Sequence, residues 1–350
     1  MNMKPLHFFV IIFALTVFAV LMGVIITVLL LDRPVDLNQV HTLDKQGRFL
    51  LSIEKGSNLK QVNLKLSQNE IIGYPLALTG WAILLGKQGI QAGDYWVEAG
   101  DTSLSLLDKF IQGDVAQHSI TFPEGWSFNQ WIEHISQISQ FSFLLNMDQD
   151  TLLALVSKDI TYPEGWFFPD TYQYSKNDNI FDILKQAHLR MCTELNLAWQ
   201  NRDDNLPYLN PYEALIMASI VEKETGQAAE RKAIAGVFVR RLKQGMRLQT
   251  DPTVIYGMGD RYKGDIRRQD LRAFTPYNTY RIEGLPPTPI AMPGLASIKA
   301  ALHPLSGSSL YFVARGDGSH QFSDTMKQHL EAVRKFQIEQ RVQDYRSAPK

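Results

Sequence analysis

The residue in this sequence best suited to acid–base chemistry is Glu222, which directly follows the apolar run 214–221. A run that is apolar on nearly every side predicts a buried helix, so the carboxyl of Glu222 should emerge at the inner end of a cleft. Burial disfavours the charged form, and comparable sites raise the pKa of a glutamic acid to about 6, which suits a general acid. Alternatively, Glu222 begins an exposed last turn and pairs with Lys223 or Arg231. Residue spacing alone leaves both interpretations open.

Hydrolysis of a glycosidic bond would require a second carboxylate that faces Glu222. An ordinary glycosidase uses one carboxyl on the leaving oxygen and another on water or on the anomeric carbon. Glu224 is poorly placed, because side chains two residues apart on a helix point about 200° away from each other. Asp251 is the best candidate, but the sequence does not place it beside Glu222. A transglycosylase that uses the sugar's own 6-hydroxyl as nucleophile avoids the requirement.

A Pro-Glu-Gly-Trp motif occurs twice, at residues 123–126 and again at 163–166. Six of the eight positions in 121–128 are identical to those in 161–168, but the flanking residues do not match. We therefore interpret the motif as a reused turn with aromatic anchors. Trp126 and Trp166 either fill the core or form a wall on which sugar rings stack.

The helix that carries Glu222 has a well-defined predicted start. Asn210 is a typical N-cap residue, Pro211 suits the first helical position, and Glu213 would complete a capping box. On a helix that begins there, Glu222 shares its face with three residues of the apolar run, namely Leu215, Ala218 and Ser219.

Residues 47–118 are predicted to form a small module with a connecting helix. Strand patterns at 49–53 and 94–97 flank two helices, near 57–66 and 76–85. This β-α-α-β order resembles a LysM-type glycan-binding module, and a purely structural subdomain is the alternative. A helix over 102–112, capped by Asp101 or Thr102, then leads to a strand at 118–122.

The rest of the chain, up to residue 350, is predicted to be a mixed helical and β domain that starts at residue 119. It is mostly helical from Ile180, with a strand at 309–313 and a hairpin turn at Asp317-Gly318 that leads into 320–322. A closing helix is expected from the spacing of four apolar residues, Leu330, Val333, Ile338 and Val342.

Residues 8–31 contain no charged side chain and predict a single transmembrane helix. At about 1.5 Å per residue they form roughly 36 Å of helix, enough to cross a hydrocarbon core of about 30 Å. A cleaved signal peptide or a buried helix is the alternative. Lys4 precedes the span, whereas Asp32 and Arg33 cancel after it, so we expect residues 1–7 in the cytoplasm and a linker over 32–46.

Composition excludes several other classes of protein. The formal charge of −1 gives no footprint for nucleic acid, and the lone Cys192 excludes an intrachain disulfide framework. The sequence has no His-Glu-x-x-His, Gly-x-Ser-x-Gly or P-loop motif, and its eight histidines lack metal-ligand spacing. We therefore expect neither a metal nor a cofactor.

Several linked motifs resemble the endolytic murein transglycosylase family (MltG, also called YceG-like). They follow one another in the family's order and cover essentially the whole chain together with the apolar span and the LysM-like segment. The motifs are 164–166, 169–172, 218–225, 240–242, 245–257, 277–281, 284–287, 293–294, 303–304 and 310–313, with Gly318 and His320.

The resemblance implies an α+β inner-membrane enzyme with a transmembrane anchor and a periplasmic catalytic domain over 119–350. Such enzymes cut nascent peptidoglycan strands internally, between N-acetylmuramic acid and N-acetylglucosamine, and leave a 1,6-anhydro end. The family's catalytic glutamate falls on Glu222. The positions thought to line the glycan cleft are Gln249, Asp251, Thr253, Tyr256, Asn278, Tyr280 and Arg281.

The family role also implies penicillin-binding synthases as partners. A different class of function stays open, in which the chain is a non-catalytic, membrane-anchored scaffold that binds peptidoglycan and positions the synthases. The two hypotheses differ in whether Glu222 is needed.

Overall fold

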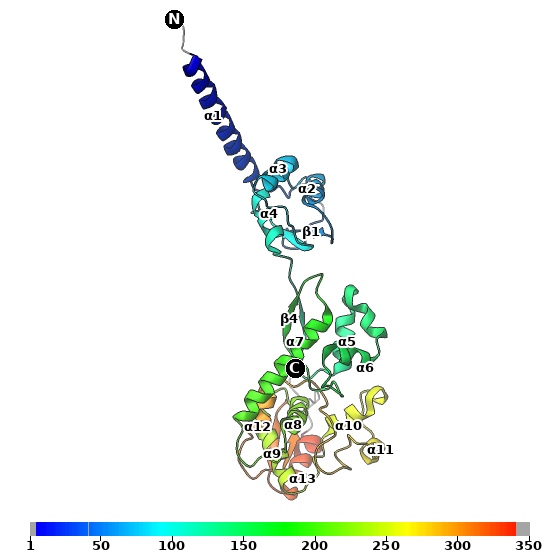
Figure 1. The fold of residues 1–350 in the computed structure, drawn as a ribbon. Coiled ribbons are helices and arrows are strands. Elements are labelled where there is room, and N and C mark those ends of the chain that lie inside the picture. The colour runs from blue at the N-terminus through cyan, green and yellow to red at the C-terminus, as the bar shows by residue number, and fades with distance from the viewer. Residues whose placement is uncertain (1–4, 41, 341–350) are drawn as a thin grey trace. The chain divides into compact units, whose positions relative to one another are not determined.

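The structure is a computed structural model that describes residues 5–40 and 42–340. It divides into two compact units, one of residues 1–118 with 173–178 and one of residues 119–172 with 179–350 (Figure 1). The chain contains both helices and short two-stranded sheets, as an α+β protein should. Residues 1–4, which include Lys4, lie outside the described residues. The placement of residues 1–7 in the cytoplasm stays a prediction.

The first unit begins with the apolar helix α1 (Pro5–Leu31). Its stretch Phe9–Leu31 has a mean hydropathy of 3.1 and is long and apolar enough to cross a membrane. Leu31 at the end of this helix is fully buried in the core of the module that follows. Val35 and Leu37 are buried in the same core, so the predicted linker 32–46 is packed against the module over part of its length.

The module has the predicted order of two strands and two helices. Strand β1 (Phe49–Ile53) pairs antiparallel with β2 (Gly93–Val97), and α2 (Leu59–Gln68) and α3 (Pro75–Leu84) lie between them in the sequence. Leu78 and Ala82 of α3 are fully buried, whereas Leu76 and Leu84 are exposed. The order of elements is confirmed, and the assignment to the LysM type stays a prediction.

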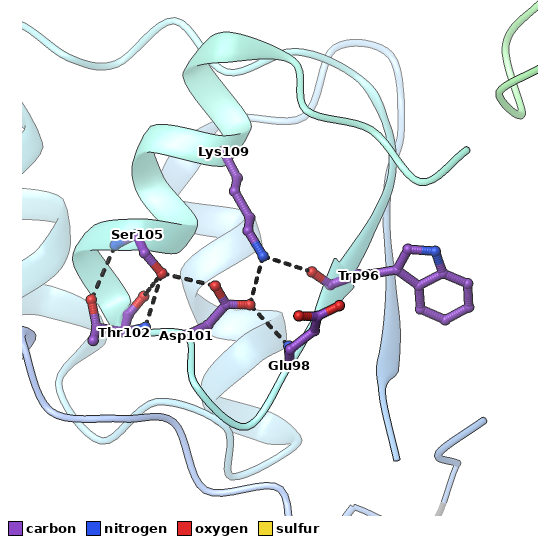
Figure 2. A network of polar contacts seen from close by, with 6 residues as sticks. All are labelled: Trp96, Glu98, Asp101, Thr102, Ser105 and Lys109. Atoms are coloured by element: carbon purple, nitrogen blue, oxygen red, sulfur yellow. Dashed lines mark hydrogen bonds and ion pairs between the residues drawn. The ribbon is translucent and has the colours of Figure 1, made fainter. Parts of the chain in front are cut away.

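Helix α4 (Ser103–Gln112) completes the first unit, and its N-cap is Thr102. The carboxylate of Asp101 lies under the first turn and is almost fully buried (Figure 2). It accepts hydrogen bonds from the N–H of Glu98 at 2.9 Å, from Ser105 Oγ at 2.9 Å and from Lys109 Nζ at 2.8 Å. Because these donors come from both sides of the turn, Asp101 joins the end of β2 to α4.

The second unit is built around α8 (Pro211–Glu224), with α7 (Ile180–Gln200), α9 (Arg231–Lys243) and α12 (Leu295–Leu302) packed against it (Figure 1). Residues 214–221 are at most 3% exposed, which confirms the predicted buried helix. The side chain of Asn210 caps it by accepting from the N–H of Glu213 at 3.1 Å. The predicted capping box is wrong, because the carboxylate of Glu213 accepts from Leu209 N rather than from Asn210 N.

The remaining elements of the second unit are short. Its strands β5 (Tyr311–Ala314) and β6 (His320–Ser323) form the predicted hairpin. Strands β3 (His118–Thr121) and β4 (Thr171–Tyr174) also pair, and each of them contains residues of both units. The closing helix is α13 (Met326–Val333), continued as a π-helical turn over Arg334–Glu339; the predicted Val342 lies outside the described residues. The other helices are α5 (Phe128–Ser136), a 3-10 helix at Ser139–Asn146, α6 (Gln149–Val156), α10 (Asp251–Met258), a 3-10 turn at Gly259–Arg261 and α11 (Arg268–Arg272).

Candidate active site

Glu222 lies in the last turn of α8, and its side chain is only 7% exposed. One carboxylate oxygen, Oε2, accepts a hydrogen bond from the backbone N–H of Gly294 at 3.1 Å. The other, Oε1, lies 3.7 Å from Nη2 of Arg231, at the start of α9. Glu222 is therefore both enclosed and paired with Arg231, and its role as a general acid stays a prediction.

A second carboxylate, that of Glu124, lies against the same arginine. Its Oε2 is 3.8 Å from Arg231 Nη2, and its side chain is 45% exposed. A Cβ on Gly294 would overlap this carboxylate, so Glu124 occupies space that only a glycine leaves free. Burial raises the pKa of Glu124 above its usual value, the charge of Glu222 raises it further, and Arg231 partly offsets both effects.

Sequence reasoning did not find Glu124, although it belongs to the first Pro-Glu-Gly-Trp motif. Both copies of the motif form turns that meet the segment 289–294. The N–H of Gly125 donates to Met292 O at 2.8 Å, Met292 N donates to Trp126 O at 2.8 Å, and Gly165 N lies 3.2 Å from Met292 Sδ. Lys223 Nζ also donates to Gly125 O at 3.0 Å, which ties the first turn to α8. The repetition of the Pro-Glu-Gly-Trp motif was therefore the feature of the sequence that could have indicated Glu124.

The face of α8 that carries Ser219 and Glu222 holds this same segment. Ser219 Oγ accepts from the N–H of Ile290 at 3.0 Å, and Glu222 accepts from Gly294 one turn later. Ser219 is fully buried. Two polar side chains of one helix face therefore fix the segment 289–294 beside the two turns.

The carboxyl group of the second turn, Glu164, is in a different environment. It accepts from Phe128 N at 3.0 Å and from the hydroxyl of Tyr256 at 3.0 Å, and the residue is only 5% exposed. Burial raises the pKa of Glu164 from its usual 4.5 to about 7, despite these hydrogen bonds and the nearby charge of Lys223. This carboxyl therefore connects the turn to α5 and α10.

Because of that raised pKa, Glu164 should make the stability of the second unit depend on pH. Between about pH 4.5 and 7 the folded state keeps a proton that the unfolded chain has released, so the free energy of unfolding falls as the pH rises through this window. In Glu164→Gln this contribution is absent. The free energy of unfolding of the variant minus that of the wild type should therefore increase by about 3 kcal/mol from pH 4 to pH 8.

Urea unfolding of both proteins at the two pH values measures this difference. Glu133→Gln, on the exposed side of α5, makes the same change of charge and should follow the wild type. A Glu164→Gln variant whose difference from the wild type is the same at pH 4 and pH 8 would contradict the prediction.

Glu224 and Asp251 lie in a second polar cluster. Thr250 Oγ1 donates to the Glu224 carboxyl, and Tyr280 OH donates to Asp251 Oδ1 at 2.7 Å. Burial raises the pKa of Glu224 to about 7; Thr250 lowers it, and Asp251 raises it further. Arg241 donates to Leu248 O at 2.7 Å, and its charge lowers the pKa of Glu224. Asp251 is thus engaged by Tyr280, and the carboxylate that shares an arginine with Glu222 is Glu124.

The other candidate residues divide by their exposure. Gln249, Asp251 and Arg281 are exposed, and Tyr256 and Tyr280 are half-buried. Thr253 is fully buried, and its hydroxyl bonds Thr250 O and Thr279 Oγ1. Asn278 is also fully buried, and its amide donates to three backbone carbonyls, those of Asp270, Leu271 and Ala273.

The two tryptophans of the repeated turns are half-buried. Trp166 stacks on Tyr212 with ring centroids 5.4 Å apart and packs against the core around α8. Trp126 meets His134 edge to face at 5.3 Å. Trp166 therefore fits the interpretation as a core residue. Trp126 packs on α5, and its partial exposure leaves the sugar-stacking hypothesis open for this residue alone.

Among residues 5–40 and 42–340, no group of three or more His, Cys, Asp or Glu side chains is arranged to hold a metal ion.

Three comparisons relate the chain to known proteins. A model of the YceG-like family matches residues 51–335. A protein from Bacillus subtilis (strain 168) named endolytic murein transglycosylase is 29% identical over 311 residues, which cover 84% of this chain and 86% of that relative. A crystal structure of a YceG-like protein from Listeria monocytogenes superposes with a TM-score of 0.52 at 27% identity, covering 81% of this chain and 98% of the other.

A longer relative comes from Streptococcus pneumoniae (strain ATCC BAA-255 / R6) and is also named endolytic murein transglycosylase. It is 25% identical over 313 residues, which cover 80% of this chain. The match spans only 56% of that relative's own length.

Proposed function

The chain belongs to the YceG-like family, and from this premise we propose that it is a membrane-anchored lytic transglycosylase of peptidoglycan. It cleaves the bond between N-acetylmuramic acid and N-acetylglucosamine within nascent strands and leaves a 1,6-anhydro end. The observation that carries the proposal is the environment of Glu222, an enclosed carboxyl beside one cation and one backbone N–H donor. The names of the relatives support the reaction and the substrate.

Glu222 acts first as acid and then as base. Its proton passes to the glycosidic oxygen, the bond from that oxygen to the anomeric carbon breaks, and an oxocarbenium-like state forms. The Glu222 carboxylate then takes the proton of the 6-hydroxyl while O6 bonds to the anomeric carbon. No water is consumed, and Glu222 ends the cycle protonated. The N–H of Gly294 and the guanidinium of Arg231 stabilise the carboxylate that exists between the two transfers.

We assign the other candidate residues their roles in glycan binding from their exposure. Gln249, Asp251 and Arg281 offer exposed amide, carboxylate and guanidinium groups to sugar hydroxyls and acetamides. Tyr256 and Tyr280 offer ring faces on which pyranose rings stack. Buried Thr253 and Asn278 hold the backbone beneath these residues and do not contact the glycan. The proposed contact residues are therefore Gln249, Asp251, Tyr256, Tyr280 and Arg281, and Thr253 and Asn278 support them.

We further propose that α1 spans the inner membrane once, with residues 1–7 in the cytoplasm and the catalytic unit in the periplasm. The length and hydropathy of Phe9–Leu31 support an anchor. Binding of glycan by the LysM-like module and a partnership with penicillin-binding synthases stay predictions from the family.

Strand shortening tests the internal mode of cleavage. Full-length protein in detergent is incubated with long peptidoglycan strands, and the strand-length distribution is followed by chromatography. We expect the mean length to fall before disaccharides accumulate, because an endolytic enzyme cuts within strands. Unchanged strands, with protein shown to be folded, would contradict the proposed function.

A further inference from the structure

We propose that Glu124 is the second carboxylate of the active site and that it shares one proton with Glu222 across Arg231. The proposal rests on the proposed function of Glu222. Glu124 acts through Glu222, as a positioning residue that keeps a proton available for transfer to the glycosidic oxygen.

The first support is distance. Both carboxylates lie near the same nitrogen, Arg231 Nη2, at 3.8 Å for Glu124 and 3.7 Å for Glu222. Their nearest oxygens are therefore at most about 7.5 Å apart, the sum of the two distances. Repulsion between like charges at that separation in a partly enclosed site is relieved when one of the two carboxylates holds a proton.

The second support is the balance of charge. Glu222 of α8 and Arg231 of α9 are the charged groups that act on Glu124, and Lys223 of α8 lies at the backbone of the same turn through Gly125 O. The segment 289–294 contains no ionisable side chain and offers the N–H of Gly294 to Glu222. One guanidinium thus faces two carboxylates, so a single proton on the pair removes the excess negative charge.

Arg231 is also only partly engaged. Both of its ion-pair distances exceed ordinary hydrogen-bond length, and its buried Nε has no hydrogen-bond partner among the described residues. The arginine therefore compensates two carboxylates incompletely. Repulsion between the two carboxylates therefore favours a state in which the pair holds one proton.

The third support is the contrast between the two Pro-Glu-Gly-Trp turns. Glu164 in the second turn is buried and is hydrogen-bonded by Phe128 and Tyr256. Glu124 in the first turn is half-exposed and faces Arg231. The two turns thus place Glu164 in the interior and Glu124 beside the proposed acid Glu222. Gly294 leaves room for the carboxylate of Glu124.

The pH profile of cleavage tests the proposal. In Glu124→Gln, Glu222 faces Arg231 without a like charge nearby, so the proton is lost at lower pH. For charges at this separation and an effective dielectric of about 20, the alkaline limb of the initial rate at saturating glycan should move down by about one to two pH units. At pH 8 the rate should fall by about tenfold or more, whereas at pH 5 it should stay within about threefold of the wild type.

Two further variants separate charge from structure. Glu124→Asp restores the charge and should return the alkaline limb most of the way to its wild-type position. Glu133→Gln removes an exposed charge from α5, the helix that follows the turn, and should leave the limb in place. Thermal melting of each variant checks that the fold is retained.

The outcomes distinguish this proposal from the function on which it rests. If Glu222→Gln abolishes cleavage while Glu124→Gln keeps the wild-type limb, or moves it upward, proton sharing is wrong and the proposed function stands. An equal loss of rate at every pH, not restored by Glu124→Asp, would also overturn proton sharing. If the wild type releases no product at any pH, the proposed function itself fails.

Discussion

Glu222→Gln should lower the rate of glycan cleavage by about 10²- to 10⁴-fold at neutral pH, the range typical for loss of a general acid–base. Glutamine fills the same space at the end of α8 and keeps an oxygen for the N–H of Gly294, but it cannot donate or accept the transferred proton. The effect should appear in the maximal rate, and glycan binding should change little, because the lost interaction acts in the transition state.

The matched control is Glu213→Gln, which removes a carboxylate from the first turn of the same helix. Glu213 accepts from Leu209 N at the far end of α8 from Glu222, so this variant should cleave glycan at close to the wild-type rate. Initial rates over a range of strand concentrations separate maximal rate from binding. Equal rates for Glu222→Gln and wild type would remove Glu222 from the mechanism and favour the scaffold hypothesis.

Gly165→Ala should destabilise the second unit by about 2–5 kcal/mol, the sum of backbone strain and overpacking. Gly165 has a φ of 84°, in the left-handed region, and an added Cβ would lie 2.5 Å from Pro289 Cγ and 2.6 Å from Pro289 Cβ. Because the ring of Pro289 is held by the segment 289–294, moving it aside costs free energy. Displacing Pro289 would also disturb the segment that presents Gly294 to Glu222.

The first turn supplies the control for this prediction. Gly125 has a φ of 76°, but an added Cβ would meet only Glu222 Cγ at 3.6 Å and Lys223 Cδ at 3.7 Å, which are ordinary contacts. Gly125→Ala should therefore cost about 1–2 kcal/mol, the backbone strain alone. Urea unfolding of the two variants compares them directly. Equal losses of unfolding free energy would mean that the approach of Pro289 to Gly165 is not tight.

The features that the sequence predicted correctly are those that depend on residues close together in the chain. The apolar run before Glu222 predicts a buried helix with a carboxyl at its end, because the helical period places the residue directly. The β-α-α-β order of the module and the hairpin of 309–313 with 320–322 were predicted for the same reason, and the structure pairs Tyr311–Ala314 with His320–Ser323. Each of these features is determined by residues that are neighbours in the sequence.

Contacts between distant residues were not predictable in this way. Glu124 reaches Arg231 because the turn at 123–126 bonds Met292, a contact that no periodicity encodes. Asp251 was the preferred second carboxylate on chemical grounds, but its place at the start of α10 brings it to Tyr280. The packing of Val35 in the module core was likewise hidden by the polar residues around it.

The end group of the product tests the central claim most directly. Full-length protein and Glu222→Gln are incubated with peptidoglycan strands, and the new ends are analysed by mass spectrometry. If Glu222 transfers the proton of the 6-hydroxyl, wild-type products should end in 1,6-anhydro sugars, one water lighter than reducing ends, and the variant should produce almost none. New reducing ends from the wild type would show that water is the nucleophile, and equal anhydro ends from both proteins would show that another group carries the reaction.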